Sequence, residues 1–129
     1  MKAPDGRMMQ HLMTLFGDTG DEEVKQGNHA VVDTGNAETL VLDIELASID
    51  DCDLYVDTSL TRSFDSWTAA YTRTAAAGVG SLRVYLEAKD GATNPLERFV
   101  RWRVKSASSP TGDWSICLSI ACQVKGLVN

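Results

Sequence analysis

The amino-acid sequence predicts an all-β protein, an antiparallel β-sandwich that is jelly-roll-like, with a short N-terminal helix or arm. Apolar residues recur at every second position in segment after segment between Thr39 and Val124, turn residues separate these segments, and no helical periodicity lies between them. A period of two is typical of strands with one face in a core and the other in water. Several such strands in series favour a sandwich or a barrel, and 129 residues suffice for one such domain.

The N-terminal region, residues 1–28, is predicted to be an arm that contains one short helix. The segment RMMQHLMTLFG predicts this helix, which ends at Gly17. Its apolar side is formed by Met9, Leu12, Met13 and Phe16. Because a helix this short is unstable alone in water, we expect it to pack on its own sandwich or on a neighbouring chain. The adaptable methionine side chains favour a partner.

The β-sandwich domain is predicted over residues 29–129, with six to eight strands. Alternation is strongest in TLVLDIELA, SLRVYLEAKDG, ERFVRWRVK and WSICLSIACQV. The strands are expected at 38–48, 54–59, 67–72, 81–89, 97–105 and 114–124, with one more short strand before the turn at Gly35-Asn36. Asp90-Gly91 is a strong signal for a tight turn.

The three cysteines are an odd number, and their spacing matches no zinc-binding pattern. Cys117 and Cys122 are five residues apart, so on one strand they point to opposite faces and cannot bond to each other. Cys52 lies an even number of residues from Leu54 and Val56, and Cys122 from Ile120, so both are expected on the core face of their strands. Free thiols that behave as small apolar side chains are the favoured interpretation, and a buried disulfide is the alternative.

The net charge of −6 divides unevenly along the chain. Residues 1–57 carry three basic and thirteen acidic residues, a balance of −10, whereas residues 58–129 carry nine basic and five acidic residues, a balance of +4. One interpretation is that acidic and basic strands pair within one sheet. The other is that the two regions lie on different surfaces and meet across a subunit contact. Neither arrangement is typical of a protein that wraps nucleic acid.

No catalytic signature is present, so we expect no enzymatic activity and no cofactor. His11 and His29 stand apart from any nucleophile or Cys/His cluster, and no GxSxG, HExxH or P-loop pattern occurs. Two acidic clusters lie in loops, but neither has the spacing of a calcium loop, and solvated loop acids are the favoured interpretation. The clusters are Asp18, Asp21, Glu22 and Glu23 in the first loop, and Asp50, Asp51 and Asp53 in the second. We predict no metal site.

Parity divides the aromatic residues between the core and the surface. Trp102 and Trp114 share the parity of core residues, and Trp67 is the freest of the tryptophans. Aromatic residues and arginines share the outward parity, a composition typical of protein contact surfaces. They are Tyr55, Tyr85 and Phe99, with Arg83, Arg101 and Arg103. The alternative is an outer face covered by another sheet of the same domain. The residues predicted to bind a partner are therefore Met9, Leu12, Met13, Phe16, Tyr85, Phe99, Arg101 and Arg103.

The segments VDTSLTRSFDSWTAAY and ERFVRWRV have a distinctive layout. A strand ends at Thr-Ser, a loop carries an Asp, a Trp packs back, and a later strand carries an aromatic-Val-Arg triplet. The residues concerned are Leu54, Val56, Thr58, Ser59, Asp65, Trp67, Thr68, Phe99, Val100, Arg101 and Val104. Over roughly residues 30–124, this layout resembles that of small β-sandwich structural proteins of phages and phage-like particles.

Discoidin-type carbohydrate-binding sandwiches have a similar arrangement. The usual Ser-x-Asp-Gly is stretched here to SLTRSFDSW, without the glycine. An extracellular discoidin-like module usually carries a signal peptide and a disulfide, and the N-terminus of this chain lacks the pattern of a signal peptide. This difference favours the resemblance to phage structural proteins.

What the resemblance implies is a virion component with no catalysis, either a capsid decoration or cement protein or a head–tail accessory. Such a protein would be made in the host cytoplasm and form a homo-oligomer. It would bind a capsid or another virion structural protein, with residues 1–28 docking on the shell or on a sister subunit. Neither nucleic acid nor a membrane is an expected partner, since no apolar run approaches the ~20 residues of a membrane span. The alternative is a carbohydrate-binding module, with a glycan stacked on Trp67.

Overall fold

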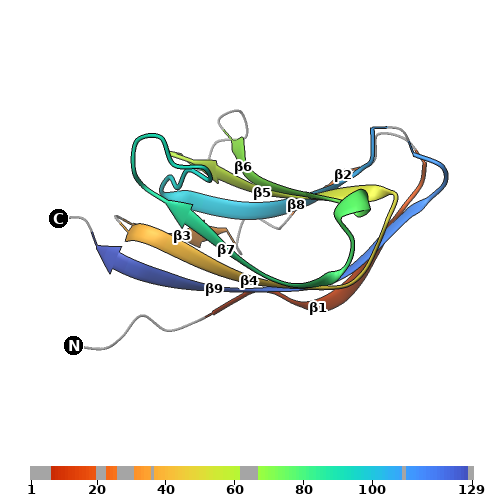
Figure 1. Ribbon diagram of the computed structural model, residues 1–129, viewed down its shortest axis with the longest axis horizontal. Coiled ribbons are helices and arrows are strands. Elements are labelled where there is room, and N and C mark those ends of the chain that lie inside the picture. Colours follow the sequence, from red (N-terminus) through yellow and green to blue (C-terminus); the bar gives the residue numbers. More distant parts are fainter. Residues whose placement is uncertain are drawn as a thin grey trace.

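The computed structural model shows a β-sandwich in which two antiparallel sheets pack face to face (Figure 1). The structure describes residues 7–19, 23–25, 31–35, 37–61, 67–108 and 110–127. One short 3₁₀ helix, η2 (Ala75–Ala77), joins the two sheets at one edge. No helix among the described residues is both long enough and apolar enough to span a membrane.

Each sheet has four main strands. Sheet A consists, in spatial order, of β1 (Arg7–Gly17), β9 (Trp114–Leu127), β4 (Ala37–Asp50) and β7 (Gly80–Glu87). Sheet B consists of β2 (Glu23–Lys25), β8 (Phe99–Ser106), β5 (Cys52–Ser59) and β6 (Thr68–Thr74), and the short β3 (Val32–Asp33) also pairs with β8. Eight strands wound in this order between two sheets form a jelly roll. The predicted fold class is therefore confirmed.

The core lies between the sheets and is filled by residues that the alternation placed inward. The fully buried aliphatic side chains are Val32, Leu40, Leu42, Ile44, Leu54, Val56, Leu86, Val100, Val104, Ile116, Leu118 and Ile120. Trp102 and Trp114 are buried as predicted. Cys52 and Cys122 are buried too, and all three cysteines are free thiols. The strands of the predicted sandwich domain agree with the observed ones to within a few residues at each end.

The predicted N-terminal helix is wrong, because Arg7–Gly17 forms strand β1, antiparallel to β9. The register of the two strands shifts between Met8 and Gln10 and again between Gln10 and Met13. Each shift inserts an extra residue into β1, as in a β-bulge, and breaks the alternation. His11 is therefore exposed between buried Met9 and half-buried Met13, and the inward residues of this part of β1 imitate one face of a helix.

A single residue, Asp51, carries the chain from β4 in sheet A to β5 in sheet B. Its φ of 54° lies in the left-handed region, which an aspartate tolerates better than most residues. Its carboxylate Oδ2 accepts hydrogen bonds from the backbone N–H of Thr111 at 3.0 Å and from the Thr111 hydroxyl at 2.7 Å. The corner between the sheets is thus fixed to the loop that precedes β9.

Candidate functional site

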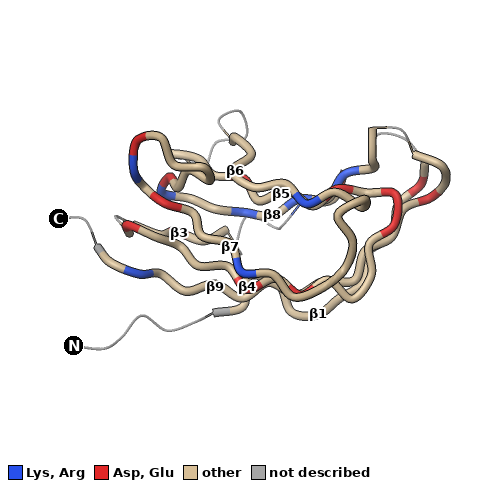
Figure 2. Tube along the Cα trace, in the orientation of Figure 1, with Lys and Arg blue, Asp and Glu red and all other residues tan. Residues whose placement is uncertain are grey.

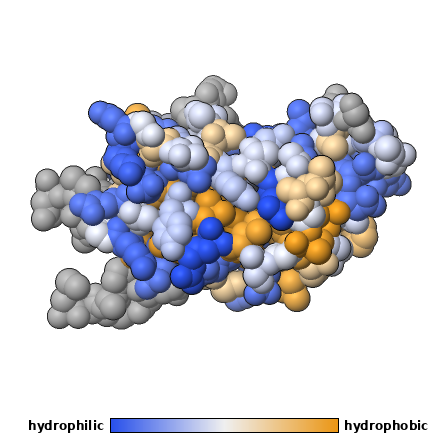
Figure 3. Space-filling model, viewed as in Figure 1, coloured by the Kyte–Doolittle hydropathy of each residue, from blue (hydrophilic) through white to orange (hydrophobic). Residues whose placement is uncertain are grey.

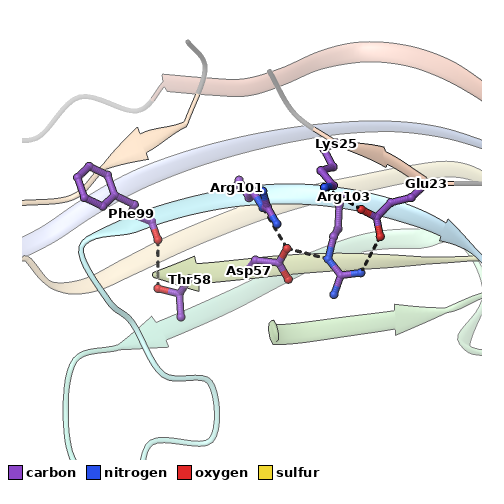
Figure 4. A network of polar contacts seen from close by, with 7 residues as sticks. All are labelled: Glu23, Lys25, Asp57, Thr58, Phe99, Arg101 and Arg103. Atoms are coloured by element: carbon purple, nitrogen blue, oxygen red, sulfur yellow. Dashed lines mark hydrogen bonds and ion pairs between the residues drawn. The ribbon is translucent and has the colours of Figure 1, made fainter. Parts of the chain in front are cut away.

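A buried cluster of charges lies on the outward side of sheet B, between β5 and β8 (Figure 4). The Oδ2 atom of Asp57 accepts hydrogen bonds from the Nε of Arg101 at 3.2 Å and from the Nε of Arg103 at 2.7 Å. The register places Asp57 directly opposite Arg101, with Arg103 two residues farther along β8. The Asp57 side chain is only 1% exposed, so this carboxylate is shielded from water by its own partners.

The cluster continues to the edge of the sheet. The Nη1 of Arg103 lies 3.4 Å from the Oε2 of Glu23, and the Nζ of Lys25 lies 3.3 Å from the Oε1 of the same glutamate. Two aromatic rings lie against the guanidinium groups, with Tyr55 centred 4.0 Å from Arg103 and Trp67 centred 4.4 Å from Arg101. Burial raises the pKa of Tyr55, and Asp53 adds to the effect. Each arginine is thus engaged by groups of its own chain.

Ion pairs between the two halves of the chain recur elsewhere. The Nε of Arg83 donates to the Oδ1 of Asp43 at 2.8 Å across β7 and β4, and hydrogen bonding to that carboxylate raises the pKa of Arg83. Arg98 forms two hydrogen bonds of 3.0 Å with Asp33, which raise its pKa as well. In the pairs of Arg83, Arg98, Arg101 and Arg103 the acid comes from residues 1–57 and the base from residues 58–129, whereas Lys25–Glu23 and Lys89–Glu87 each join residues of the same half. The pairs between the halves agree with the interpretation that acidic and basic strands pair within one sheet.

The residues predicted to bind a partner fall into two groups. Leu12 and Phe16 on β1 and Tyr85 on β7 are exposed on sheet A, and Met13 on β1 is half-buried. The other group is packed within the chain. Met9, Phe99 and Arg101 are buried and Arg103 is largely covered, so these side chains offer little surface to a partner. The outward parity of Phe99 and Arg101 was predicted, but alternation alone does not show that neighbouring side chains cover them.

Strand β1 carries a row of exposed apolar side chains, which we call the β1 row. It consists of Met8, Leu12 and Phe16, which are 39%, 66% and 73% exposed. Met8 was not among the predicted contact residues, because the segment was predicted as a helix with Met9, Leu12, Met13 and Phe16 on its apolar side. From Met8 to Gly17 the strand has no acidic residue and no lysine or arginine, as its uncharged trace in Figure 2 shows. From Met8 to Gly17, this edge of sheet A therefore combines exposed apolar side chains with uncharged polar ones such as Thr14.

The end of β1 is fixed in place. The backbone N–H and the hydroxyl of Thr19 both donate to the Oδ1 of Asp113, at 3.0 and 3.1 Å. Gly17 pairs with Trp114, and a Cβ on this glycine would lie 2.0 Å from the indole ring. A shallow hollow of about 240 Å³ lies beside Phe16, lined also by Gly17, Asp18, Asp113 and Trp114. The exposed phenyl ring thus projects from a backbone that is held by its neighbours.

The opposite edge of the sandwich has an open groove between β6 and β7. Figure 3 shows apolar surface there, and the groove of about 410 Å³ is lined by Tyr71, Leu82, Arg83, Val84, Tyr85, Glu87, Thr93 and Asn94. The loop after β7 folds back over the end of this strand. The N–H of Glu87 donates to Asn94 O at 2.9 Å, and the N–H of Leu96 donates to Glu87 O at 2.9 Å. Unlike β1, strand β7 is therefore partly covered by the chain itself.

Those residues considered for chemistry that the structure describes do not converge on a site. His11 is exposed on β1, whereas His29 lies outside the described residues. In the described part of the chain, no three His, Cys, Asp or Glu side chains gather as metal ligands would. Of the two acidic loop clusters, Asp21 and Glu22 lie outside the described residues. The indole of Trp67 has the Arg101 guanidinium over one of its two faces, so a sugar could not stack on that face.

Comparison with known proteins gives a likeness at the level of the fold. No family model and no curated protein sequence matches the chain. The structure of infectious bursal disease virus, Gx strain, is similar with a TM-score of 0.48 and 16% identity, over 97% of this chain and 34% of that chain. The VP2 subviral particle of the same virus gives a TM-score of 0.47 and 13% identity, over 95% of this chain and 33% of that chain. This chain spans about a third of the length of each of these two chains.

Proposed function

We propose that this chain is a non-enzymatic virion structural protein that attaches to a capsid or head lattice and stabilises it. As a decoration protein, cement protein or head–tail accessory it would be made in the host cytoplasm and reside in the virion. The observation that carries the proposal is a jelly roll whose exposed apolar side chains gather on one sheet, while the charged residues outside the other sheet are engaged within the chain.

The distribution of exposed apolar side chains supports this proposal. The exposed large apolar residues among the described ones are Met8, Leu12, Phe16, Leu60, Val79 and Tyr85. Four of them lie on strands of sheet A, and only Leu60 and Val79 lie in loops. Exposed apolar and aromatic side chains on a firm backbone are typical of surfaces that contact other proteins. Sheet A is therefore the proposed contact side of the sandwich.

The fold and the sequence pattern also support a virion structural role. Jelly rolls recur in viral capsid and lectin domains, although a fold by itself does not assign a function. The pattern that runs from Leu54 to Val104 resembles that of phage structural proteins, as described above. The proposed mechanism is mechanical, since many copies that each bind a lattice weakly stabilise it strongly together.

The direct test is to purify particles from the source of this chain and to identify their proteins by mass spectrometry and immunogold labelling. We expect the chain in a fixed ratio to the main shell protein. Its absence from purified particles would overturn the proposal. A glycan that quenches tryptophan fluorescence, with the response lost in Trp67→Ala, would support the carbohydrate-binding module instead.

A second experiment locates the lattice contact. Purified chain is added to particles that lack it, and co-sedimentation is measured. We expect Tyr85→Glu to weaken co-sedimentation, because it adds a charge to the proposed contact side. The matched control is Leu60→Glu, which changes an exposed leucine in a loop and should bind like the unmodified protein. Equal binding of both variants would exclude Tyr85 from the contact.

A further inference from the structure

The groove between β6 and β7 follows two unpaired sheet edges. β7 is the edge strand of sheet A and β6 is that of sheet B, and η2 joins the two strands, so both lie along one open side of the sandwich (Figure 1). Apart from one bridge between Glu87 and Pro95, no described residue pairs with β7 on this side. A free strand edge presents backbone groups that are a template for pairing with another chain.

Two hydrogen bonds show which backbone groups of β7 face the groove. The N–H of Ala88 donates to the carbonyl of Glu38 in β4 at 2.9 Å, whereas the N–H of Glu87 donates in the other direction, to Asn94 O. Alternate residues of a strand direct their N–H and C=O groups to opposite sides, and β7 pairs with β4 without a register shift. Arg83 and Tyr85 therefore direct their backbone N–H and C=O groups away from β4, into the groove.

The chain itself shows what this edge accepts. At Glu87 the edge is occupied by an extended piece of the following loop, since Pro95 lies beside Glu87 in a parallel bridge and the N–H of Leu96 donates to Glu87 O at 2.9 Å. At Tyr85 and Arg83 no backbone group among the described residues takes the corresponding position. These two residues repeat along the strand at about 6.8 Å, the spacing of alternate residues in another extended backbone.

The side chains of the groove describe an uncharged occupant. Its two charged lining residues already have partners, because Arg83 Nε lies 2.8 Å from Asp43 and Glu87 Oε2 lies 3.4 Å from Lys89. The apolar part of the lining comes from Tyr71 and Leu82, which pack against the core, and from Tyr85, which is 48% exposed. A segment with apolar side chains at alternate positions would place them against these residues.

The shape of the groove favours a single segment over a second copy of the protein. The edge of β7 is flanked by Tyr71 of β6 and by Thr93 and Asn94 of the loop, and the groove between them has a volume of about 410 Å³. A second copy would bring the same flanking groups and the same net charge of −6, so its approach is obstructed and repelled. A single extended segment is narrower and reaches the backbone of Arg83 and Tyr85.

We propose, on the basis of the virion role proposed above, that the groove between β6 and β7 holds an extended, uncharged segment of the main shell protein. The segment adds one strand to sheet A beside Arg83 and Tyr85. Main-chain hydrogen bonds to these two residues supply affinity, and alternate side chains of the segment against Tyr71 and Leu82 supply specificity. Attachment through many copies then makes the weak single contacts strong together.

The first experiment measures amide hydrogen exchange of the unmodified protein, free and attached to particles that lack it. We expect slower exchange at the N–H groups of Arg83 and Tyr85 in the attached protein, because these groups gain hydrogen-bond acceptors. The N–H groups of Leu82 and Val84 already face β4 and are the internal control. Attachment with new protection along β1 and none at Arg83 and Tyr85 would overturn this assignment and leave the virion role standing.

The second experiment does not need the lattice. Short linear peptides are selected from a displayed random library on the purified protein, and their affinity is measured by fluorescence anisotropy. We expect peptides with alternating apolar residues and no charge. Arg83→Pro removes the N–H that faces the groove without touching the hydrogen bonds to β4, and should weaken binding at least about tenfold. Arg83→Thr is the matched control, because it loses the same side chain, keeps the N–H and should bind like the unmodified protein.

The outcomes separate the groove from the virion role. Equal binding by Arg83→Pro and Arg83→Thr would overturn the strand pairing, and thermal unfolding of both variants shows whether the proline is tolerated. If the proline variant does not fold, hydrogen exchange of the unmodified protein with a selected peptide decides, and protection away from Arg83 and Tyr85 would overturn the assignment. Peptide binding at the groove without attachment to particles would overturn the virion role and the shell protein as the source of the segment, but not the pairing edge.

Discussion

Asp57 and Arg101 lie directly opposite each other on β5 and β8, and their side chains form an ion pair of 3.2 Å. Their side chains are only 1% and 8% exposed. Moving two charges out of water is costly, and the Coulomb attraction offsets the cost only where the hydrogen bonding is good. Here one oxygen, Oδ2, accepts both arginine hydrogen bonds, and Oδ1 has no hydrogen-bond partner among the described residues. The pair is therefore a point where the fold is sensitive to substitution.

Replacing Asp57 with Ala will leave the Arg101 guanidinium buried without its counter-charge. Removing one member of a buried pair lowers the free energy of unfolding by about 3–5 kcal/mol. Urea-induced unfolding, followed by tryptophan fluorescence, measures the loss. In the double variant Asp57→Leu/Arg101→Met, apolar groups replace both charges of this pair, and we expect it to recover part of the stability, because Arg103 then keeps only Glu23 as its acidic partner. The control Asp43→Ala breaks an exposed pair and should hardly move the unfolding midpoint; equal losses in both single variants would contradict this account.

Gly17→Ala will disturb the junction of β1 and β9, although alanine fits the backbone conformation there. The reason is space, since the added Cβ would lie 2.0 Å from the Cε2 of Trp114. Overpacking of this kind costs about 1–3 kcal/mol of unfolding free energy. Thermal unfolding and the near-ultraviolet circular dichroism of the tryptophans report the change. Gly112→Ala is the matched control, because the nearest atom to its Cβ would be the Oδ2 of Asp51 at 3.9 Å. Equal stability of the two variants would show that the Trp114 ring can move away from the added methyl group at little cost in free energy.

The sequence was sufficient to predict the sandwich and its core, because strand alternation is a local property. Leu42 and Ile120 were placed inward by their own neighbours in the chain, and both are fully buried. The alternation also predicted the outward direction of Arg101. It did not predict the burial of Arg101 against Asp57, because this contact joins residues 44 positions apart and depends on the register of β5 and β8. Long-range register is not encoded in a local pattern.

The N-terminal strand could not be predicted for a related reason. Two register shifts in β1 interrupt the period of two, and its inward residues imitate one face of a helix. The β1 row was therefore only partly identified, through Leu12 and Phe16. In the folded chain these residues pair with the edge of β9, and this pairing favours a strand over a helix. The sequence of residues 7–17 alone does not show that β9 will lie beside them.

Thr58→Val will destabilise the protein, although the two side chains have nearly the same shape. The buried Thr58 hydroxyl accepts a hydrogen bond from the N–H of Glu97 at 2.7 Å and donates to the carbonyl of Phe99 at 3.2 Å. The substitution leaves both backbone groups without this partner, at a cost of about 1–3 kcal/mol. Urea unfolding measures it. Thr58→Ser keeps the hydroxyl and should lose much less, whereas similar losses in the two variants would show that the methyl group, not the hydroxyl, matters.

The stability of the protein will fall as the pH rises from 9 to 11. Burial raises the pKa of the Cys52 thiol from 9.0 to about 11, and the nearby carboxylates of Asp53, Asp50 and Asp51 add to the effect. Between these values the folded chain keeps a proton that the unfolded chain has lost, so the unfolded state is favoured increasingly with pH. Unfolding free energies at pH about 8.5 and about 10.5 measure the difference.

Cys52→Ala isolates the contribution of this thiol. The variant is less stable at both pH values because of the lost packing, but its decrease between them should be smaller than that of the unmodified protein. Some decrease will remain, because the raised pKa of Tyr55 acts in the same direction. Cys117→Ser, which changes a half-buried thiol on the outward side of β9, is the matched control and should keep the full decrease. If Cys52→Ala also shows the full decrease in unfolding free energy, groups other than the Cys52 thiol cause the loss of stability at alkaline pH.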